Sequence, residues 1–181
     1  MKNRTLIYLI FLTAFFSQKG FSQAFNFGIY NGTGINLVDV EKSQGWELVD
    51  WNTYSNLTNI QGLFMLNEKL QIGGEVGAHR LYYWERRSPN TGYYSWGTMW
   101  TYNVDLLAAA SLNEKIVFKA GIGMRTYSDA SGSAFAGLAS IEYELISFGK
   151  FTIPIGLRTD LIMANATTSS INLFLGICTN K

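Results

Sequence analysis

The chain has 181 residues, of which 48% are hydrophobic, 15% aromatic and only 15% charged, and its formal net charge is +1. This composition excludes an intrinsically disordered chain, and a mean hydropathy of +0.06 excludes a bundle of membrane-spanning helices. The single cysteine excludes an internal disulfide, no Cys/His cluster indicates a metal or cofactor site, and no basic cluster indicates nucleic-acid binding.

The first residues have the layout of an export signal. Lys2 and Arg4 provide a positive start, and an apolar run follows over residues 6–16 before polar and small residues. This order is typical of a secretory signal peptide, and the run is too short to cross a bilayer as a helix, which takes about 20 residues. The alternative is a buried N-terminal helix. We interpret residues 1–23 as a signal peptide.

The predicted cleavage site lies near Gln23. The ending Phe21-Ser22-Gln23 before Ala24 resembles the cleavage sites of exported proteins of the Bacteroidota. We expect the remaining residues, 24–181, to form one exported domain, because no linker or composition shift divides them.

After the signal the dominant period of the sequence is two, which is the period of a β-strand. In residues 116–125, for example, Ile116 and Phe118 lie on one face, whereas Lys119 and Arg125 lie on the other. Eight segments of about ten residues alternate in this way, the first, second and last less sharply: 25–37, 57–66, 70–79, 100–111, 116–125, 135–145, 151–161 and 171–178.

The connections between these segments alternate between short and long. Tight turns are expected at 67–69, 113–115 and 148–150, and longer loops at 38–55, 86–98, 127–133 and 163–169. Short turns at one end and long loops at the other are the plan of outer-membrane barrels. The sequence therefore predicts an all-β fold, an eight-stranded antiparallel up-and-down transmembrane β-barrel, with both termini at the short-turn, periplasmic end.

The volumes of the side chains decide which face of the barrel points inward. The interior of an eight-stranded barrel is just wide enough for its own side chains to fill it. The bulky apolar residues share one face, and small, polar and charged residues share the other. We therefore expect the bulky face to point outward, where only lipid tolerates so much apolar surface.

Eight charged residues fall on the predicted inward face: Glu75, Asp105, Lys119, Arg125, Glu142, Glu144, Arg158 and Asp160. Because unpaired charge in a narrow interior is costly, we expect these residues to form ion pairs. Hairpin register places Lys119 near Glu142, with Arg158 diagonally beyond, and Asp105 beside Arg125. We interpret the set as a structural plug that fills the lumen, and a gated ion path is the alternative.

Aromatic residues are expected at both ends of the barrel. Tyr and Trp cluster around the second long loop, and Phe25, Phe27, Phe64, Phe148 and Phe151 lie toward the short turns. Two such belts are typical of the interfacial girdles of membrane barrels. The alternative for the Tyr/Trp cluster is a binding rim for a glycan or peptide, formed by Tyr93, Tyr94, Trp96 and Trp100.

The single histidine, His79, is the candidate catalytic base, because nucleophilic hydrolysis by serine usually needs a histidine base. Outer-membrane lipid deacylases place a serine two residues after their histidine, where this chain has Leu81. No local pattern completes a triad, so we predict that the protein is not an enzyme and that His79 forms hydrogen bonds in the lumen or at its rim.

With this signal, alternation and turn pattern, the chain resembles the small outer-membrane β-barrel proteins of the Bacteroidota and, more broadly, the eight-stranded OmpA/OmpX-type barrels. The resemblance covers about residues 24–178 and implies an outer-membrane location, with outer-membrane lipid around the barrel. It is one of architecture, and no motif identifies a subfamily.

The leading functional hypothesis is a non-enzymatic barrel that serves envelope structure or contacts an extracellular glycan or protein through loops 38–55 and 86–98. One alternative is a soluble or periplasmic lipocalin-like barrel that binds a small apolar ligand, which requires the bulky face to point inward. Another is a lipid-modifying outer-membrane enzyme, which requires His79 for activity.

Overall fold

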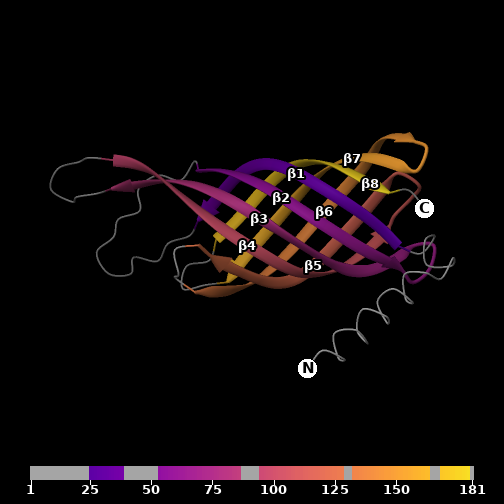
Figure 1. Cartoon of the computed structure of the whole chain (residues 1–181), viewed down its shortest axis with the longest axis horizontal. Coiled ribbons are helices and arrows are strands. Elements are labelled where there is room, and N and C mark those ends of the chain that lie inside the picture. The colour runs from indigo at the N-terminus through magenta and orange to yellow at the C-terminus, as the bar shows by residue number, and fades with distance from the viewer. Residues whose placement is uncertain (1–24, 39–52, 87–93, 129–131, 164–167, 180–181) are drawn as a thin grey trace, which may run out of the picture.

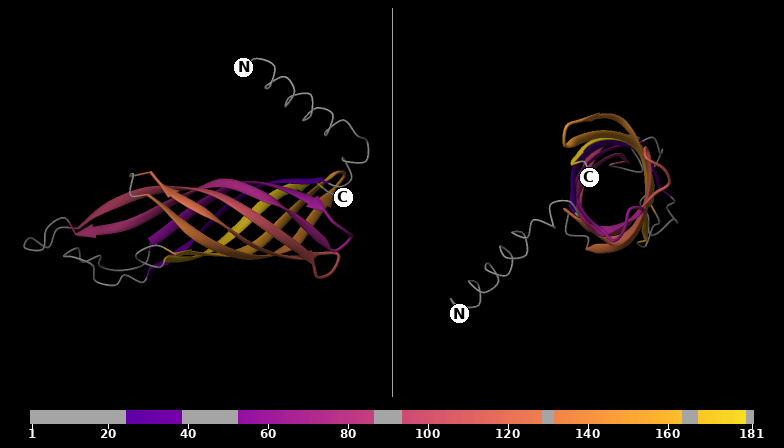
Figure 2. Two further views of the ribbon diagram at one scale, coloured as in Figure 1. Left: turned by 90° about the horizontal axis from the view of Figure 1, so that it is seen from below. Right: turned by 90° about the vertical axis from the view of Figure 1, so that its right-hand side faces the viewer.

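The computed structural model describes residues 25–38, 53–86, 94–128, 132–163 and 168–179, which form a closed barrel of eight antiparallel strands (Figures 1 and 2). The strands are β1 (Phe25–Val38), β2 (Thr53–Met65), β3 (Leu70–Arg86), β4 (Tyr94–Ser111), β5 (Ile116–Tyr127), β6 (Ser133–Phe148), β7 (Phe151–Met163) and β8 (Thr168–Thr179). Within these ranges no helix is long and apolar enough to cross a membrane.

Each strand pairs with its neighbour in sequence, and β1 closes the barrel by pairing with β8. Following the paired residues once around the wall from Trp100 leads back to β4 at Ala110, a stagger of ten residues. Such a stagger requires the strands to tilt by about 35–45° from the barrel axis. Figure 2 shows this tilt from the side and the closed ring from the end.

The predicted eight-stranded antiparallel fold is confirmed, but most strands extend further toward the long-loop end than alternation indicated. The largest difference is in β3 and β4, which stay paired as far as Arg86 and Tyr94 and project beyond the rest of the wall (Figure 1). The expectation of a loop over 86–98 was therefore wrong for residues 86 and 94–98, which are strand. Parts of the loops expected at 38–55, 127–133 and 163–169 are strand as well.

The short turns at the opposite end follow from asparagine chemistry. Asn67 accepts hydrogen bonds from the backbone nitrogens of Lys69 and Leu70, each at 2.9 Å. Asn113 repeats this arrangement in the turn between β4 and β5. The turn between β6 and β7 instead places Gly149 at a φ of 58°, in the left-handed region that favours glycine. These local bonds fix the register of the hairpins.

The two faces of the wall are sorted as side-chain volume requires. On β5, the side chain of Lys119 is buried with 3% exposure, whereas Ile122 is 57% exposed on the outer surface. Large exposed apolar side chains occur on all eight strands, and the described buried charged residues lie in the lumen.

The lumen also holds apolar side chains, some of them larger than the small and polar residues expected there. Leu63, Leu107, Ala109 and Leu138 form one buried cluster, and Ala134, Ala136 and Ile162 form another nearer the long-loop end. Tyr30 and Phe174 also point inward, with their rings in edge contact at a centroid distance of 5.5 Å. The lumen is thus a mixed core, in which apolar clusters separate the polar groups.

Inward-facing glycines make room for these larger side chains, which gives a test of lumen packing. A Cβ added at Gly77 would collide with the side chain of Asn59 and the backbone oxygen of Thr58, whereas one added at Gly137 meets open space. We expect Gly77→Ala to lower the free energy of unfolding by about 1–3 kcal/mol. The control Gly137→Ala should change it by less than about 0.5 kcal/mol. Urea unfolding of the refolded barrel measures both, and equal effects would contradict this account of packing.

Candidate functional site

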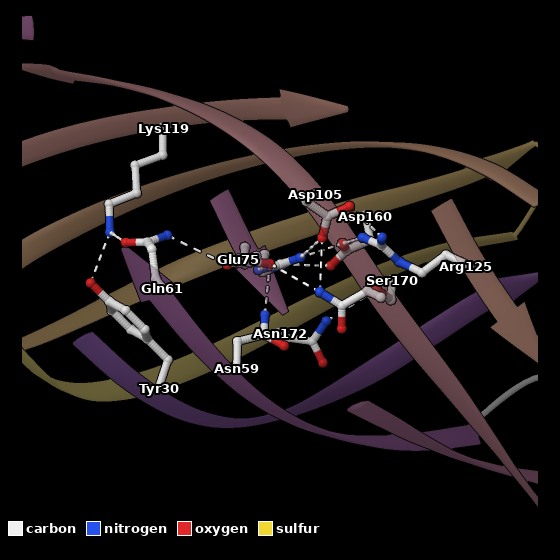
Figure 3. A network of polar contacts seen from close by, with 12 residues as sticks. Tyr30, Asn59, Gln61, Glu75, Asp105, Lys119, Arg125, Asp160, Ser170 and Asn172 are labelled. Atoms are coloured by element: carbon white, nitrogen blue, oxygen red, sulfur yellow. Dashed lines mark hydrogen bonds and ion pairs between the residues drawn. The ribbon is translucent and has the colours of Figure 1, made fainter. Parts of the chain in front are cut away.

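The middle of the lumen is filled by a network of charged side chains, shown in Figure 3. Arg125 donates to Asp105 at 2.5 Å and to Asp160 at 2.7 Å, and its side chain is fully buried. Arg158 donates to Asp160 through Nε at 2.8 Å and also pairs with Glu75 on the opposite wall. These five residues, from β3, β4, β5 and β7, are called here the central network.

Amide side chains complete the bonding of the central network. Asn59 Nδ2 donates to Glu75 Oε1 at 2.8 Å, and Asn103 Nδ2 donates to Asp105 Oδ2 at 2.8 Å. Both amides are buried on the lumen face beside the carboxylates they contact. Since a buried carboxylate is costly unless its lone pairs are occupied, these bonds stabilise the negative charge that the two arginines leave uncompensated.

A second charged group lies closer to the short-turn end. Lys119 Nζ contacts Glu142 Oε1 at 2.5 Å, Gln61 Oε1 at 2.6 Å and the Tyr30 hydroxyl at 2.8 Å, so all three of its donors are used. The Tyr30 hydroxyl also lies 2.9 Å from Cys178 Sγ. Figure 3 shows Lys119, Gln61 and Tyr30 beside the central network.

Two spaces of different size flank the second group. Between it and the central network is a cavity of about 10 Å³, lined by Asn59, Ser140 and Glu142 among others, which has room for about one water molecule. On the other side is an open chamber of about 1150 Å³ that reaches the short turns. Cys178 and Glu144 lie on its wall. The network thus occupies the lumen on one side of a wide mouth with polar and apolar residues on its wall.

The structure brings seven of the eight charged residues predicted for the lumen into buried ion pairs. Lys119 pairs with Glu142 and Arg125 with Asp105, as hairpin register indicates. Arg158 belongs to the central network and not to the Lys119 group, because its guanidinium reaches Glu75 across the lumen. Glu144 is set apart: it is half-buried at the chamber, beside a β-bulge, and accepts a hydrogen bond from Ser147.

Sequence reasoning missed the uncharged members of the site, Tyr30, Asn59, Gln61 and Asn103. Each lies at an inward position of its strand, so strand parity alone could have identified it. For Tyr30, Asn59 and Gln61 the signal was weak because β1 and β2 also carry polar residues on their outward faces.

The residues suggested as a binding rim lie mostly on a strand where the structure describes them. Tyr94 and Trp96 belong to β4, and Tyr93 lies outside the described residues, as do most of loop 38–55 and residues 87–93. Trp100 is on the outward face of β4, 41% exposed, with the Arg80 guanidinium 5.6 Å from its ring centroid.

His79 is buried in the lumen with 2% exposure, opposite Thr101 on the neighbouring strand. Among the described residues, no group of three or more His, Cys, Asp and Glu side chains is placed to hold a metal ion. His79 therefore lies within the barrel core, away from the outer surface that a lipid substrate would reach.

Comparison with known proteins finds similarity in structure only. No protein-family model and no curated protein matches the chain. The structure of Ail, the attachment invasion locus protein of Yersinia pestis, is 16% identical, with a TM-score of 0.51 over 84% of this chain and 97% of that one. Ail in complex with the heparin analogue sucrose octasulfate is 14% identical, with a TM-score of 0.50 over 86% and 99%. These likenesses establish the fold, an eight-stranded barrel like those of small outer-membrane proteins.

The pairing in the central network gives a stability test. Arg125→Met leaves Asp105 and Asp160 with an uncompensated negative charge in the core, so we expect a loss of about 3–5 kcal/mol in the free energy of unfolding. The exposed turn variant Lys115→Met should change it little. Adding Asp105→Asn to Arg125→Met should recover part of the loss, and a failure to recover any would argue against a charge-based cause. Urea titration followed by tryptophan fluorescence reports all three.

Proposed function

We propose that this chain is a non-enzymatic outer-membrane barrel with a plugged polar lumen, which acts through envelope structure or through its long-loop end. The observation that carries the proposal is the outer surface. On β4 the outward side chains run from Trp100 to Ala110, about ten residues along a tilted strand, or roughly 25 Å along the barrel axis. The apolar band of membrane barrels has about this height.

Aromatic residues at the two ends of this surface support membrane insertion. Trp100 and Tyr54 are exposed toward the long-loop end, and Phe148 and Phe151 are exposed at the short turns, with their rings 6.0 Å apart. Between the two ends the exposed residues are mostly Leu, Ile, Val, Phe and Met. In water such a surface would aggregate, whereas in a bilayer it matches the hydrocarbon region.

A lipocalin-like function is disfavoured by the direction of the bulky face. That reading requires a large apolar cavity enclosed by the barrel, but the middle of this lumen is occupied by ion pairs. Its larger chamber is open at the short turns, and its wall mixes apolar residues with charged ones such as Lys119 and Glu142. The burial of His79 similarly disfavours a lipid-modifying enzyme.

The long-loop end is the side we propose for contact with an extracellular glycan or protein. The paired strands β3 and β4 project beyond the wall there (Figure 1), and β1 ends and β2 begins at the same end. The similar barrel of Ail has been crystallised with a heparin analogue, which makes an anionic glycan a reasonable first ligand to test.

A single substitution distinguishes a membrane barrel from a soluble one. Leu106 is 71% exposed in the middle of the outward face of β4, so in water Leu106→Arg would be harmless. In a bilayer we expect it to cost about 2–4 kcal/mol. Leu112→Arg, in an exposed short turn outside the band, is the control. The measurement is urea unfolding from lipid vesicles.

Fractionation of expressing cells tests the location of the protein, together with the change in gel mobility that folded barrels show on boiling. Detergent-free extraction would overturn the proposal.

The plug predicts that the two ends of the lumen are not connected. A charged methanethiosulfonate reagent should modify Cys178, which borders the chamber, in the folded protein. It should not modify a Ser170→Cys variant made with Cys178→Ser, because Ser170 is on the same strand but is buried beside the central network, opposite Asp160. Urea unfolding should expose both thiols equally. A steady, large conductance in planar bilayers, or equal labelling in the folded state, would contradict the plug.

A further inference from the structure

One part of the outer surface departs from its apolar character. Four uncharged polar side chains point outward on β1 and β2: Asn31, Thr33, Asn56 and Thr58. Strand register places Asn31 opposite Thr58 and Thr33 opposite Asn56, so the four residues are contiguous on strands that run side by side (Figure 1). We call these four residues the polar patch.

The polar patch lies within the apolar band and not at its edge. Toward the short turns it is bordered by Ile29 and Ile60, and toward the long loops by Ile35 and Tyr54, all four of them exposed. The outward face of β8 beside it carries Ile171, Leu173 and Leu175. On β3, register places Ala78 beside Thr58 and Arg80 beside Asn56, and the Arg80 guanidinium lies 5.6 Å from the Trp100 ring centroid. Elsewhere on the described outward surface, Thr159 is an isolated polar residue at comparable depth, and the other polar residues lie near strand ends.

The hydrogen-bonding capacity of the polar patch exceeds what its own residues use. Asn31 Nδ2 donates to Thr58 Oγ1 at 2.9 Å. Within the described ranges, the second N–H and the oxygen of the Asn31 side chain have no side-chain partner. The side chains of Thr33 and Asn56 also have none within those ranges. Lipid tails offer neither donors nor acceptors, so these groups gain free energy when another polar surface covers them.

We propose that the polar patch is the centre of an interface with a second copy of this chain, related by a two-fold axis along the membrane normal. The inference rests on the membrane location proposed above. Both copies insert in the same orientation, and such an axis brings every residue to the depth of its equivalent. The patch of one copy therefore meets the patch of the other at the same level of the bilayer.

The chemistry of the patch favours a second copy over a different partner. Asparagine side chains both donate and accept, as do threonine hydroxyls, so an identical patch supplies a partner for each group. The four residues of the patch carry no charge, so they do not repel their equivalents in a second copy, and the guanidinium of the neighbouring Arg80 is directed toward the Trp100 ring on β4. Between membrane helices, small and uncharged polar residues mediate association, and each polar contact there contributes about 0.6 kcal/mol on average. A lipid tail could not supply such bonds.

Disulfide trapping tests the interface in the full-length processed protein. In a Cys178→Ser background, Thr33→Cys lies close to the proposed axis, and Ile122→Cys, on β5 across the barrel, is the control at an exposed position of the same band. In vesicles at high lipid dilution under mild oxidation, we expect Thr33→Cys to form a dimer band at least about tenfold faster than Ile122→Cys. Equal rates would overturn the proposal.

A second variant separates the interface from membrane insertion. This variant makes the whole patch apolar by combining Asn31→Leu, Thr33→Val, Asn56→Leu and Thr58→Val. An apolar patch suits a lipid-facing wall, so membrane insertion and the gel shift on boiling should stay intact. Energy transfer between labelled copies should fall, with the dimer dissociation constant in lipid raised about tenfold or more. Unchanged energy transfer would reject the dimer while leaving the membrane barrel standing, whereas failure of the unmodified chain to insert would reject both.

Discussion

The width of the tube is the constraint on which the rest of the structure depends. Eight strands with a stagger of ten residues enclose a lumen that side chains from opposite walls can span. Arg158 on β7 reaches Glu75 on β3, and Lys119 on β5 reaches Tyr30 on β1, in each case across the tube. A wider barrel would hold water between these groups. In this one each buried charge finds a direct partner, and the network forms as a consequence of closure.

The same constraint fixes the outer surface. Because the lumen has no room for the bulky residues of all eight strands, most of them point outward, and the apolar wall follows from the volume limit inside. Inside, the larger side chains need neighbouring glycines. The Tyr30 ring occupies the space that a Cβ on Gly28 or Gly176 would take, and Phe174 similarly lies against Gly156. The glycines of the strands are thus matched to particular rings.

Strand parity and turn chemistry allowed much of this fold to be predicted from sequence, but contacts across the lumen could not be. Register relates residues on adjacent strands, so Lys119 with Glu142 was accessible from the hairpin pattern. The bond from Arg158 to Glu75 joins strands on opposite walls, and its partner depends on tilt and stagger, which alternation does not reveal. The first, second and last segments alternate weakly because Tyr30, Leu57 and Phe174 are large residues at inward positions.

Two sets of residues thus depart from the sorting of bulky side chains outward and polar side chains inward: large residues that point inward and polar residues that point outward. The two sets are compensated differently. Large inward residues such as Tyr30 are accommodated within the chain, by glycines and by hydrogen bonds to Lys119. The outward residues Asn56 and Thr33 have no comparable compensation, because neither side chain has a hydrogen bond to another side chain in the described ranges, and the guanidinium of the neighbouring Arg80 lies against the Trp100 ring. A polar group in the wall that is left unsatisfied by the chain must obtain its partner from outside it. For this reason the outward polar residues on β1 and β2 indicate contact with a second molecule, whereas the large inward residues are satisfied by contacts within the barrel.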